Sequence, residues 1–135
     1  MKEQTLIAQE IRLVDEKGQV RLVLSEIGGL PTINMLGKDG AIRLTASLDG
    51  TGYGSIKIAN PIATAPGAAL ELDDKGAHVK FDRPGGGSAY LFLNNAGESG
   101  VVFVDTNDKR RLNLLVKQNG QAEIQRFNEE QQPVP

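Results

Sequence analysis

The chain contains no cysteine and no tryptophan, and it has a single histidine. Without cysteine it has no disulfide framework, no thiolate nucleophile and no cysteine-ligated zinc. One histidine rules out a metal site built on several histidines and a relay between two of them. The sequence therefore predicts no catalytic metal and no organic cofactor, and only oxygen-ligated ions such as calcium are left to consider.

Aromatic residues are also scarce, at 4% of the chain. A compact β-sandwich usually takes much of its core volume from aromatic rings, because each ring buries roughly 150–250 Å². Here the apolar residues are mainly leucine, isoleucine, valine and alanine. Small aliphatic side chains in strands favour a narrow, layered β-structure.

No strong charge and no long apolar run is present. The formal net charge is −2, from 15 lysines and arginines against 17 acidic residues. No broad basic field would attract nucleic acid or an anionic membrane. No stretch approaches the roughly 20 apolar residues of a membrane helix, and the N-terminus lacks a signal-peptide run. We therefore expect a soluble protein without nucleic-acid partner or membrane insertion, cytoplasmic or virion-associated, with its compartment otherwise open.

A repeated strand–turn–strand phrase is the main positive feature. Residues 11–22 return 22 positions later as residues 33–44, with Gly18 matched by Gly40 and Arg21 by Arg43. Weaker echoes follow further along, and in the last of them Asp108 replaces the turn glycine. A fixed period of this length indicates a repeat architecture whose units bury their apolar faces on each other.

Alternation of apolar and polar residues covers most of the chain. Each alternating run is followed by turn residues such as Asp-Gly or Asn-Gly, which adopt the positive φ angles of tight hairpins. The pattern predicts about ten or eleven short strands and almost no helix. We assign residues 1–127 to a single β-repeat domain and expect the polar residues 128–135 to be a disordered tail.

Many short strands leave unpaired edges that invite association. Closure into a sandwich or barrel is one solution, and intertwining of three chains around an aliphatic axis is another. The few aromatics, the frequent glycine and the repeated turn favour the second. The predicted fold is therefore an all-β, intertwined trimeric β-prism or β-helix, with a monomeric β-sandwich as the alternative.

The phrase Leu-Val-Asp-Glu-Lys-Gly-Gln-Val-Arg at residues 13–21 resembles the LVDxxGxxR repeats of bacterial and phage-associated proteins. The wider pattern is similar to the β-prism and triple-stranded β-helix modules of phage tail fibres and spikes. This resemblance implies an elongated, trimeric structural module. It supplies no catalytic residues.

Candidate catalytic groups all have a simpler interpretation. His78 alternates with apolar neighbours, so it is interpreted as an ordinary exposed strand histidine, and no Gly-x-Ser-x-Gly elbow supports a catalytic triad. Carboxylates gather at turns, as in the pairs Asp15/Glu16, Asp73/Asp74 and Asp105/Asp108. A calcium loop or a glycosidase pair would need such groups, but aspartate in a turn normally accepts local backbone hydrogen bonds. We therefore predict no catalytic, cofactor-binding or metal-binding residues.

Two glycine-rich segments, 50–54 and 84–88, are each followed by a predicted strand, whereas a phosphate cradle needs a following helix. We interpret both as hairpin loops. The basic run 109–111 lacks the interleaved aromatics of a single-strand binding surface, so we interpret it as a solvated turn, with contact to an anion or glycan as the alternative.

Three functions remain in view. The first is a non-enzymatic, fibre- or spike-like structural and interaction module that forms a homotrimer. The second is a sandwich that binds carbohydrate or protein, for which Tyr53, Tyr90 and Phe92 would form a sugar-stacking platform if they converged. The third, a phage-type polysaccharide-degrading enzyme on a trimeric β-helix, rests on architecture alone.

Overall fold

The computed structural model describes residues 5–135, and these residues form an all-β protein without a helix. One antiparallel sheet contains all twelve strands in the order of the sequence. The strands are β1 (Glu10–Val14), β2 (Val20–Ile27), β3 (Leu30–Leu36), β4 (Ile42–Leu48), β5 (Gly54–Ile58), β6 (Gly67–Asp73), β7 (Gly76–Asp82), β8 (Ser88–Asn94), β9 (Ser99–Val104), β10 (Arg110–Val116), β11 (Ala122–Phe127) and β12 (Pro133–Val134).

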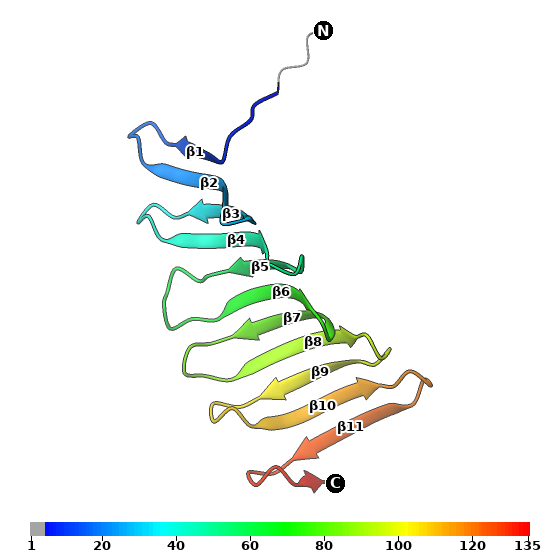
Figure 1. The fold of residues 1–135 in the computed structure, drawn as a ribbon. Helices are drawn as coiled ribbons and strands as arrows, with labels where there is room; N and C mark the ends of the chain where they lie inside the picture. The colour runs from blue at the N-terminus through cyan, green and yellow to red at the C-terminus, as the bar shows by residue number, and fades with distance from the viewer. Residues whose placement is uncertain (1–4) are drawn as a thin grey trace.

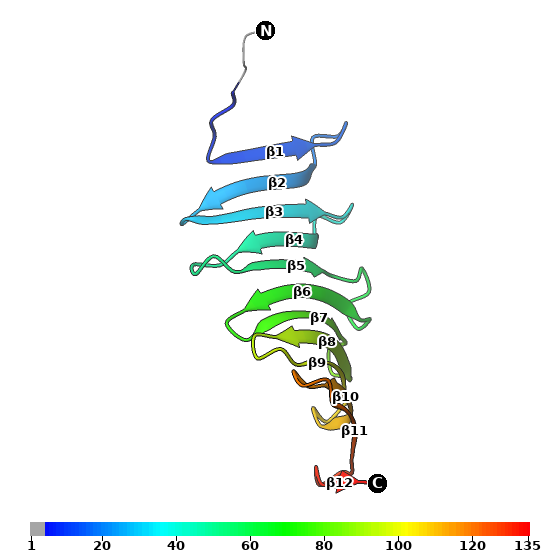
Figure 2. The same ribbon diagram turned by 90° about the vertical axis from the view of Figure 1, so that its right-hand side faces the viewer.

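The sheet is open and twisted. Figures 1 and 2 show the strands stacked one after another, with the two chain ends at opposite ends of the stack and a progressive twist between them. Within the described residues, each strand contacts only its neighbours in the sequence. The predicted all-β fold is thus confirmed. The alternative of a monomeric sandwich is wrong, because residues 5–135 form a single sheet on which no second sheet packs.

One turn recurs throughout the described part of the chain, in residues 15–19, 37–41, 49–53, 94–98, 105–109, 117–121 and 128–132. The first residue's N–H donates to the fifth residue's carbonyl, and the fourth residue's N–H donates to the first residue's carbonyl. The fourth residue always has a positive φ, which favours glycine. Glycine occupies that position in five of these turns, and Asp108 (φ 58°) and Gln131 (φ 63°) occupy it in the other two.

Arginine follows two of these turns at a fixed distance. Arg21 donates to Asp15 Oδ2 six residues earlier, at 2.8 Å, and Arg111 donates to Asp105 Oδ2 with the same spacing, at 2.6 Å. In the second repeat the position equivalent to Asp15 is Gly37, which has no carboxylate, and Arg43 pairs with Asp39 instead. Gly18 and Gly40 have nearly equal φ angles of 76° and 77°. The predicted equivalence of the two repeats is confirmed.

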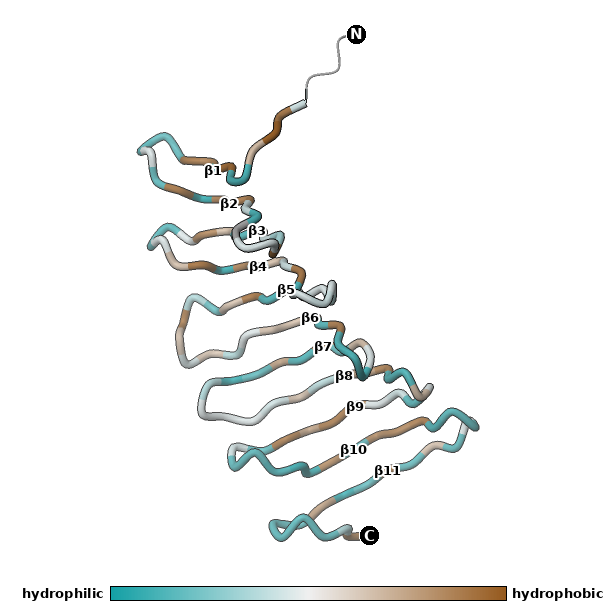
Figure 3. Tube along the Cα trace, viewed as in Figure 1, coloured by the Kyte–Doolittle hydropathy of each residue, from teal (hydrophilic) through white to brown (hydrophobic). Residues whose placement is uncertain are grey.

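The register separates an apolar from a polar face. Residues directly opposite one another across a ladder share a face. The central apolar row is Ile11, Leu24, Ile33, Ala46, Ile56, Leu70, Val79, Leu91, Val101, Leu114 and Ile124. The adjoining polar-face row is Arg12, Val23, Asn34, Thr45, Lys57, Ala69, Lys80, Tyr90, Val102, Asn113 and Gln125. Figure 3 shows hydrophobic and hydrophilic residues mixed along the strands, while most of the turns are hydrophilic.

Within residues 5–135, nothing covers the apolar face. Leu70 remains 43% exposed, Leu91 56% and Leu93 58%. Val102 is the one hydrophobic residue of the described chain that is fully buried, and it lies on the polar face. The interior that a globular domain of this length would have is therefore missing from the isolated sheet.

The C-terminal residues 128–135, which the sequence suggested to be a disordered tail, form a turn and the short strand β12. β12 pairs with β11 through Arg126↔Val134 and Phe127↔Pro133. The Gln131 side chain also accepts a hydrogen bond from Arg110 N–H at 3.1 Å and donates to Arg110 C=O at 3.0 Å. These contacts tie the segment to the sheet. The first four residues of the predicted domain lie outside the described range.

No helix of residues 5–135 is long and apolar enough to cross a membrane.

Candidate ligand-binding site on the polar face

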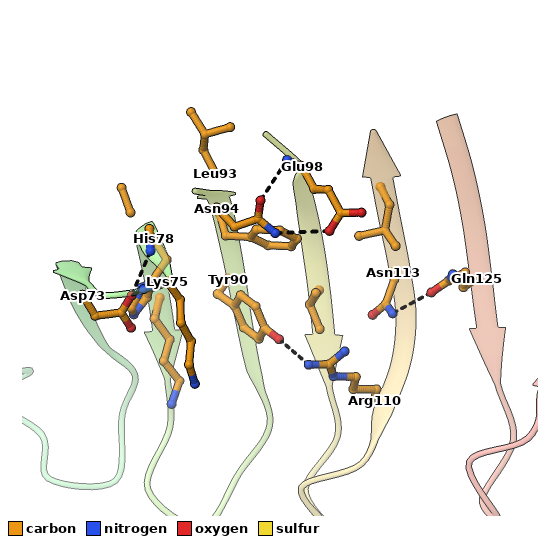
Figure 4. A pocket seen from close by; sticks show the side chains of 16 residues that line it. Asp73, Lys75, His78, Tyr90, Leu93, Asn94, Glu98, Arg110, Asn113 and Gln125 are labelled. Carbon is orange, nitrogen blue, oxygen red and sulfur yellow. Dashed lines mark hydrogen bonds between the residues drawn. The ribbon is translucent and has the colours of Figure 1, made fainter. Parts of the chain in front are cut away.

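A hollow of about 530 Å³ lies on the polar face over strands β7 to β11. Figure 4 shows side chains from these strands converging on it. We call it the polar-face site and define it by the six residues that carry its chemistry: His78, Lys80, Tyr90, Phe92, Arg110 and Asn113. It is the place where the meander brings ring, amide and cationic groups together from separate strands.

Two aromatic rings form one part of the site. Tyr90 and Phe92 alternate on β8, so both point to the polar face, and their ring centroids are 6.1 Å apart with a tilt of 47°. Phe92 lies opposite Gly100 of β9. A Cβ added at Gly100 would be 3.0 Å from Phe92 Cε1 and 2.6 Å from the Leu114 carbonyl oxygen. The glycine therefore leaves the space in which the Phe92 ring lies.

A buried amide lies between the strands of the site. Asn113 on β10 is 3% exposed, and its Nδ2 donates to Gln125 Oε1 at 3.0 Å. Gln125 Nε2 in turn donates to Glu123 Oε2 at 3.1 Å, and Lys117 donates to the other oxygen of Glu123. This chain of hydrogen bonds fixes which side of the Asn113 amide carries nitrogen. Asn113 Oδ1 is buried and accepts no hydrogen bond from residues 5–135; it lies on the side away from Gln125 in Figure 4.

Positive charge exceeds available negative charge at the hollow. Arg110 donates to the Tyr90 hydroxyl at 3.2 Å, and within residues 5–135 neither Arg110 nor Lys75 forms an ion pair with a carboxylate. The two acidic residues at the rim are already engaged. Asp73 accepts hydrogen bonds from the backbone of Lys75 and Gly76.

Glu98, the second acidic residue at the rim, accepts a hydrogen bond from Asn94 Nδ2 at 3.2 Å. Both carboxylates thus serve the turns beside the hollow. Of the cations of the polar-face site, Arg110 remains open to an external anion, whereas Lys80 Nζ lies 3.6 Å from Asp82 Oδ1.

His78 has a partner on the neighbouring strand. Its Nε2 lies 3.2 Å from Glu71 Oε2, and Lys57 Nζ lies 2.9 Å from Glu71 Oε1. The hydrogen bond from Lys57, helped by Lys57's charge and by His78, lowers the pKa of Glu71. The group is a cross-strand ion cluster on the polar face. His78 is half-buried beside it, not on the fully exposed surface that the sequence suggested.

The turn carboxylates have the structural role that the sequence predicted. Asp15 Oδ1 accepts hydrogen bonds from the backbone N–H groups of Lys17 and Gln19. The Gln19 hydrogen bond is the main reason that the pKa of Asp15 is lowered. Burial acts to raise the pKa of Asp105, but backbone donors and Arg111 outweigh it and the pKa is lowered.

No group of three or more potential metal-ligating side chains occurs within the part of the chain that the structure describes. The glycine-rich segments are hairpin loops, as predicted. One lies between β4 and β5 and the other between β7 and β8.

Of the three aromatic residues that would form a stacking platform if they converged, two lie together. Tyr90 and Phe92 converge, whereas Tyr53 lies in the turn before β5 and lines a different hollow. The basic run separates in a similar way. Lys109 donates to the Glu129 carbonyl, Arg111 pairs with Asp105, and Arg110 alone enters the polar-face site.

Sequence reasoning missed Asn113 and Gln125. Each stands in an alternating run, at the position where a polar residue is expected to meet water. The signal that would have found them is the ladder register, which aligns Tyr90, Val102, Asn113 and Gln125 across four strands. To predict that register from the sequence, the length of each hairpin loop must be known, and the loops of this chain vary in length.

No protein-family model matches the chain, and none of the curated proteins matches it. The fold and the site define it as a single-sheet, repeat-built β-protein with a polar and an apolar face.

Proposed function

We propose that the protein is a non-enzymatic structural and interaction module, fibre- or spike-like, which assembles as a homotrimer through its apolar face. The observation that carries this proposal is the uncovered apolar face, which extends over the whole sheet. The resemblance of residues 13–21 to LVDxxGxxR repeats supports the same role.

The exposed area measures how much cover is missing. The chain exposes 9930 Å², whereas a compact monomer of 14.5 kDa is expected to expose about 6,900 Å². The excess of about 3,000 Å² per chain is in the range of obligate interfaces, which bury about 2,000–5,000 Å² in total. Monomeric proteins rarely leave an apolar patch of more than about 600 Å² exposed. Both faces of the open sheet share this excess, and an apolar occupant of the apolar face would remove the part that this face contributes.

The width of the apolar face favours three copies. Three rows of apolar residues along a strand span five to seven residues, or about 16–23 Å at about 3.3 Å per residue. Three faces of this width enclose a triangular prism whose axis is about 5–7 Å from each sheet, close to half the usual sheet-to-sheet spacing of about 10 Å. Leucine, isoleucine and valine fill such a space without large rings. The scarcity of aromatics agrees with this geometry.

Backbone pairing within the chain determines what kind of contact the copies make. Neighbouring strands of the meander already satisfy each other's hydrogen bonds. Copies would therefore meet through side chains, as three faces of a prism, and the polar faces would form the outer surface. Folding and assembly would be coupled, since each sheet lacks a core of its own.

Light scattering after size-exclusion chromatography tests the proposal. At micromolar concentration we expect a mass of about 43.5 kDa, three times the 14.5 kDa of one chain. A folded monomer of 14.5 kDa, or a dimer of twice that mass, would refute the trimer.

A further inference from the structure

We propose that the polar-face site binds an acidic saccharide. The proposal goes beyond the assembly role, because it concerns the opposite face of the sheet. Its chemistry comes from three groups that strands β7, β8 and β10 bring together: the ring pair Tyr90 and Phe92, the buried amide of Asn113, and the cations Arg110 and Lys80.

The rings provide the apolar part of a sugar site. The C–H groups of a pyranose ring pack on an aromatic face, and tyrosine adds a hydroxyl at the wet end of its ring. The Phe92 ring packs in the space that Gly100 leaves open, and the Tyr90 hydroxyl accepts a hydrogen bond from Arg110. Both rings are therefore placed before a ligand arrives, which lowers the entropic cost of binding.

The buried amide provides a reason to expect a hydrogen-bonding ligand. An unpaired buried acceptor costs about 1–3 kcal/mol, so Asn113 Oδ1 needs a donor that residues 5–135 do not supply. A saccharide hydroxyl is such a donor, and it reaches Oδ1 once a side chain lining the hollow shifts, because the atom itself is covered in this structure. A leucine at this position would avoid the cost and would fit the apolar patch formed by Val102 and Leu115.

The charges select an acidic sugar over a neutral one. The rim carboxylates Asp73 and Glu98 are committed to turns, while Arg110 retains guanidinium donors that no carboxylate of the described chain engages. A planar guanidinium matches a carboxylate through two parallel hydrogen bonds. A uronate unit would present its ring to Tyr90 and its carboxylate to Arg110.

None of the six residues that define the site lies on the apolar face, so the site and the trimer are compatible. The polar face is opposite the apolar face, so three copies of the site would face water in a prism. Binding of a long acidic polysaccharide to several copies would then gain from multivalency.

Isothermal titration calorimetry with the α-1,4-linked trimer of galacturonate tests the proposal. The neutral galactose trimer of the same linkage, inorganic sulfate and an oligothymidylate are the comparison ligands. We expect saturable binding of the acidic trisaccharide that weakens with added salt and much weaker binding of the other three. Equal binding of the neutral sugar, of sulfate or of the oligonucleotide would overturn the assignment, as would no binding of the acidic trisaccharide.

Two variants locate the ligand. Arg110→Ala is expected to weaken binding about tenfold or more, because it removes hydrogen bonds to a charged group. Arg83→Ala, which removes the same charge from the β7–β8 loop outside the site, should leave binding unchanged. Equal effects of the two substitutions would place the ligand elsewhere.

Asn113→Leu separates a binding role from a structural one. We expect this variant to lose affinity while its melting temperature stays the same or rises, because an unsatisfied buried group has been removed. A lower melting temperature with unchanged affinity would refute the role given to Asn113. The mass of each sample, measured in parallel, keeps the tests apart: a monomer that binds refutes only the trimer, and a trimer that does not bind refutes only the site.

Discussion

Leu70→Asp and Ala69→Asp are neighbouring substitutions that place the same charge on opposite faces of β6. Leu70 lies between Ile56 and Val79 on the apolar face, whereas Ala69 lies between Lys57 and Lys80 on the polar face. The two variants have the same added charge and the same strand. They differ in the face that receives the carboxylate.

The structure allows the effect on assembly to be estimated. Full burial of a leucine side chain contributes about 1.5–3 kcal/mol, and Leu70 is still 43% exposed in the single sheet. Completing its burial in a trimer would thus contribute roughly 1 kcal/mol per chain. An unpaired carboxylate in the same place costs several kcal/mol, and a trimer would contain three of them near one axis. The total loss of roughly 10 kcal/mol or more corresponds to about seven orders of magnitude in the assembly constant.

We therefore expect Leu70→Asp to abolish the trimer at micromolar concentration, with loss of the β-sheet signal in circular dichroism. Ala69→Asp should remain trimeric with the thermal stability of the unchanged protein, because its carboxylate lies between two lysines. Sedimentation equilibrium measures the mass of both variants. A trimeric Leu70→Asp protein, or equal damage by both substitutions, would show that the apolar face is not the contact between chains.

Two further predictions concern the fold. Gly100→Ala should lower stability by about 1–3 kcal/mol in urea unfolding, because its Cβ would be 2.6 Å from the Leu114 carbonyl oxygen; a neutral effect would contradict this packing. Acid should also destabilise the protein. The pKa values of Asp15, Asp49 and Glu71 are lowered in the folded state, so their contribution is complete above the unfolded values near 4 and is lost as pH falls below them. A urea midpoint unchanged between pH 6 and pH 3 would refute this.

The strands and turns were predictable from the sequence because they depend on local residues. The alternation in residues 42–48 and 112–116 directly gives the face of each side chain, and glycine at the fourth turn position marks where φ is positive. Asp108 was recognised as the glycine's replacement, and its φ of 58° agrees. The arginine in each repeat was also correctly placed on the polar face.

The unit of repetition was less clear from the sequence. Residues 11–22 and 33–44 suggest a period of two strands, whereas the same turn also follows single strands, as at 94–98 and 105–109. The shorter turn between β2 and β3 interrupts the pattern early in the chain. In the second half of the chain, three of the turns begin with asparagine or lysine instead of aspartate, which makes the repeat harder to recognise in the sequence.

The polar-face site was only partly predictable, because it depends on register across four hairpins. Tyr90 and Phe92 could be paired from their spacing, but Asn113 joins them through pairing across β9 and β10. A side chain in an alternating run is normally expected to be solvated. Its burial here comes from the neighbouring Val102 and Leu115, whose apolar character on the polar face is an exception to the pattern.

Val102 and Leu115 bear on both proposals, the trimer formed through the apolar face and the ligand site on the polar face. If the polar face served only to keep a trimer in solution, we would expect hydrophilic residues along all of it, as at most positions over β2 to β5. Over β8 to β10 the same face instead contains two aromatic rings, a buried valine and an amide with an unmet hydrogen bond. Apolar contacts explain the rings and the valine, but they make the amide more costly. The proposed ligand, by donating to Asn113 Oδ1, would account for all three features together, and in the proposed trimer the outer face would then have a function distinct from that of the axis.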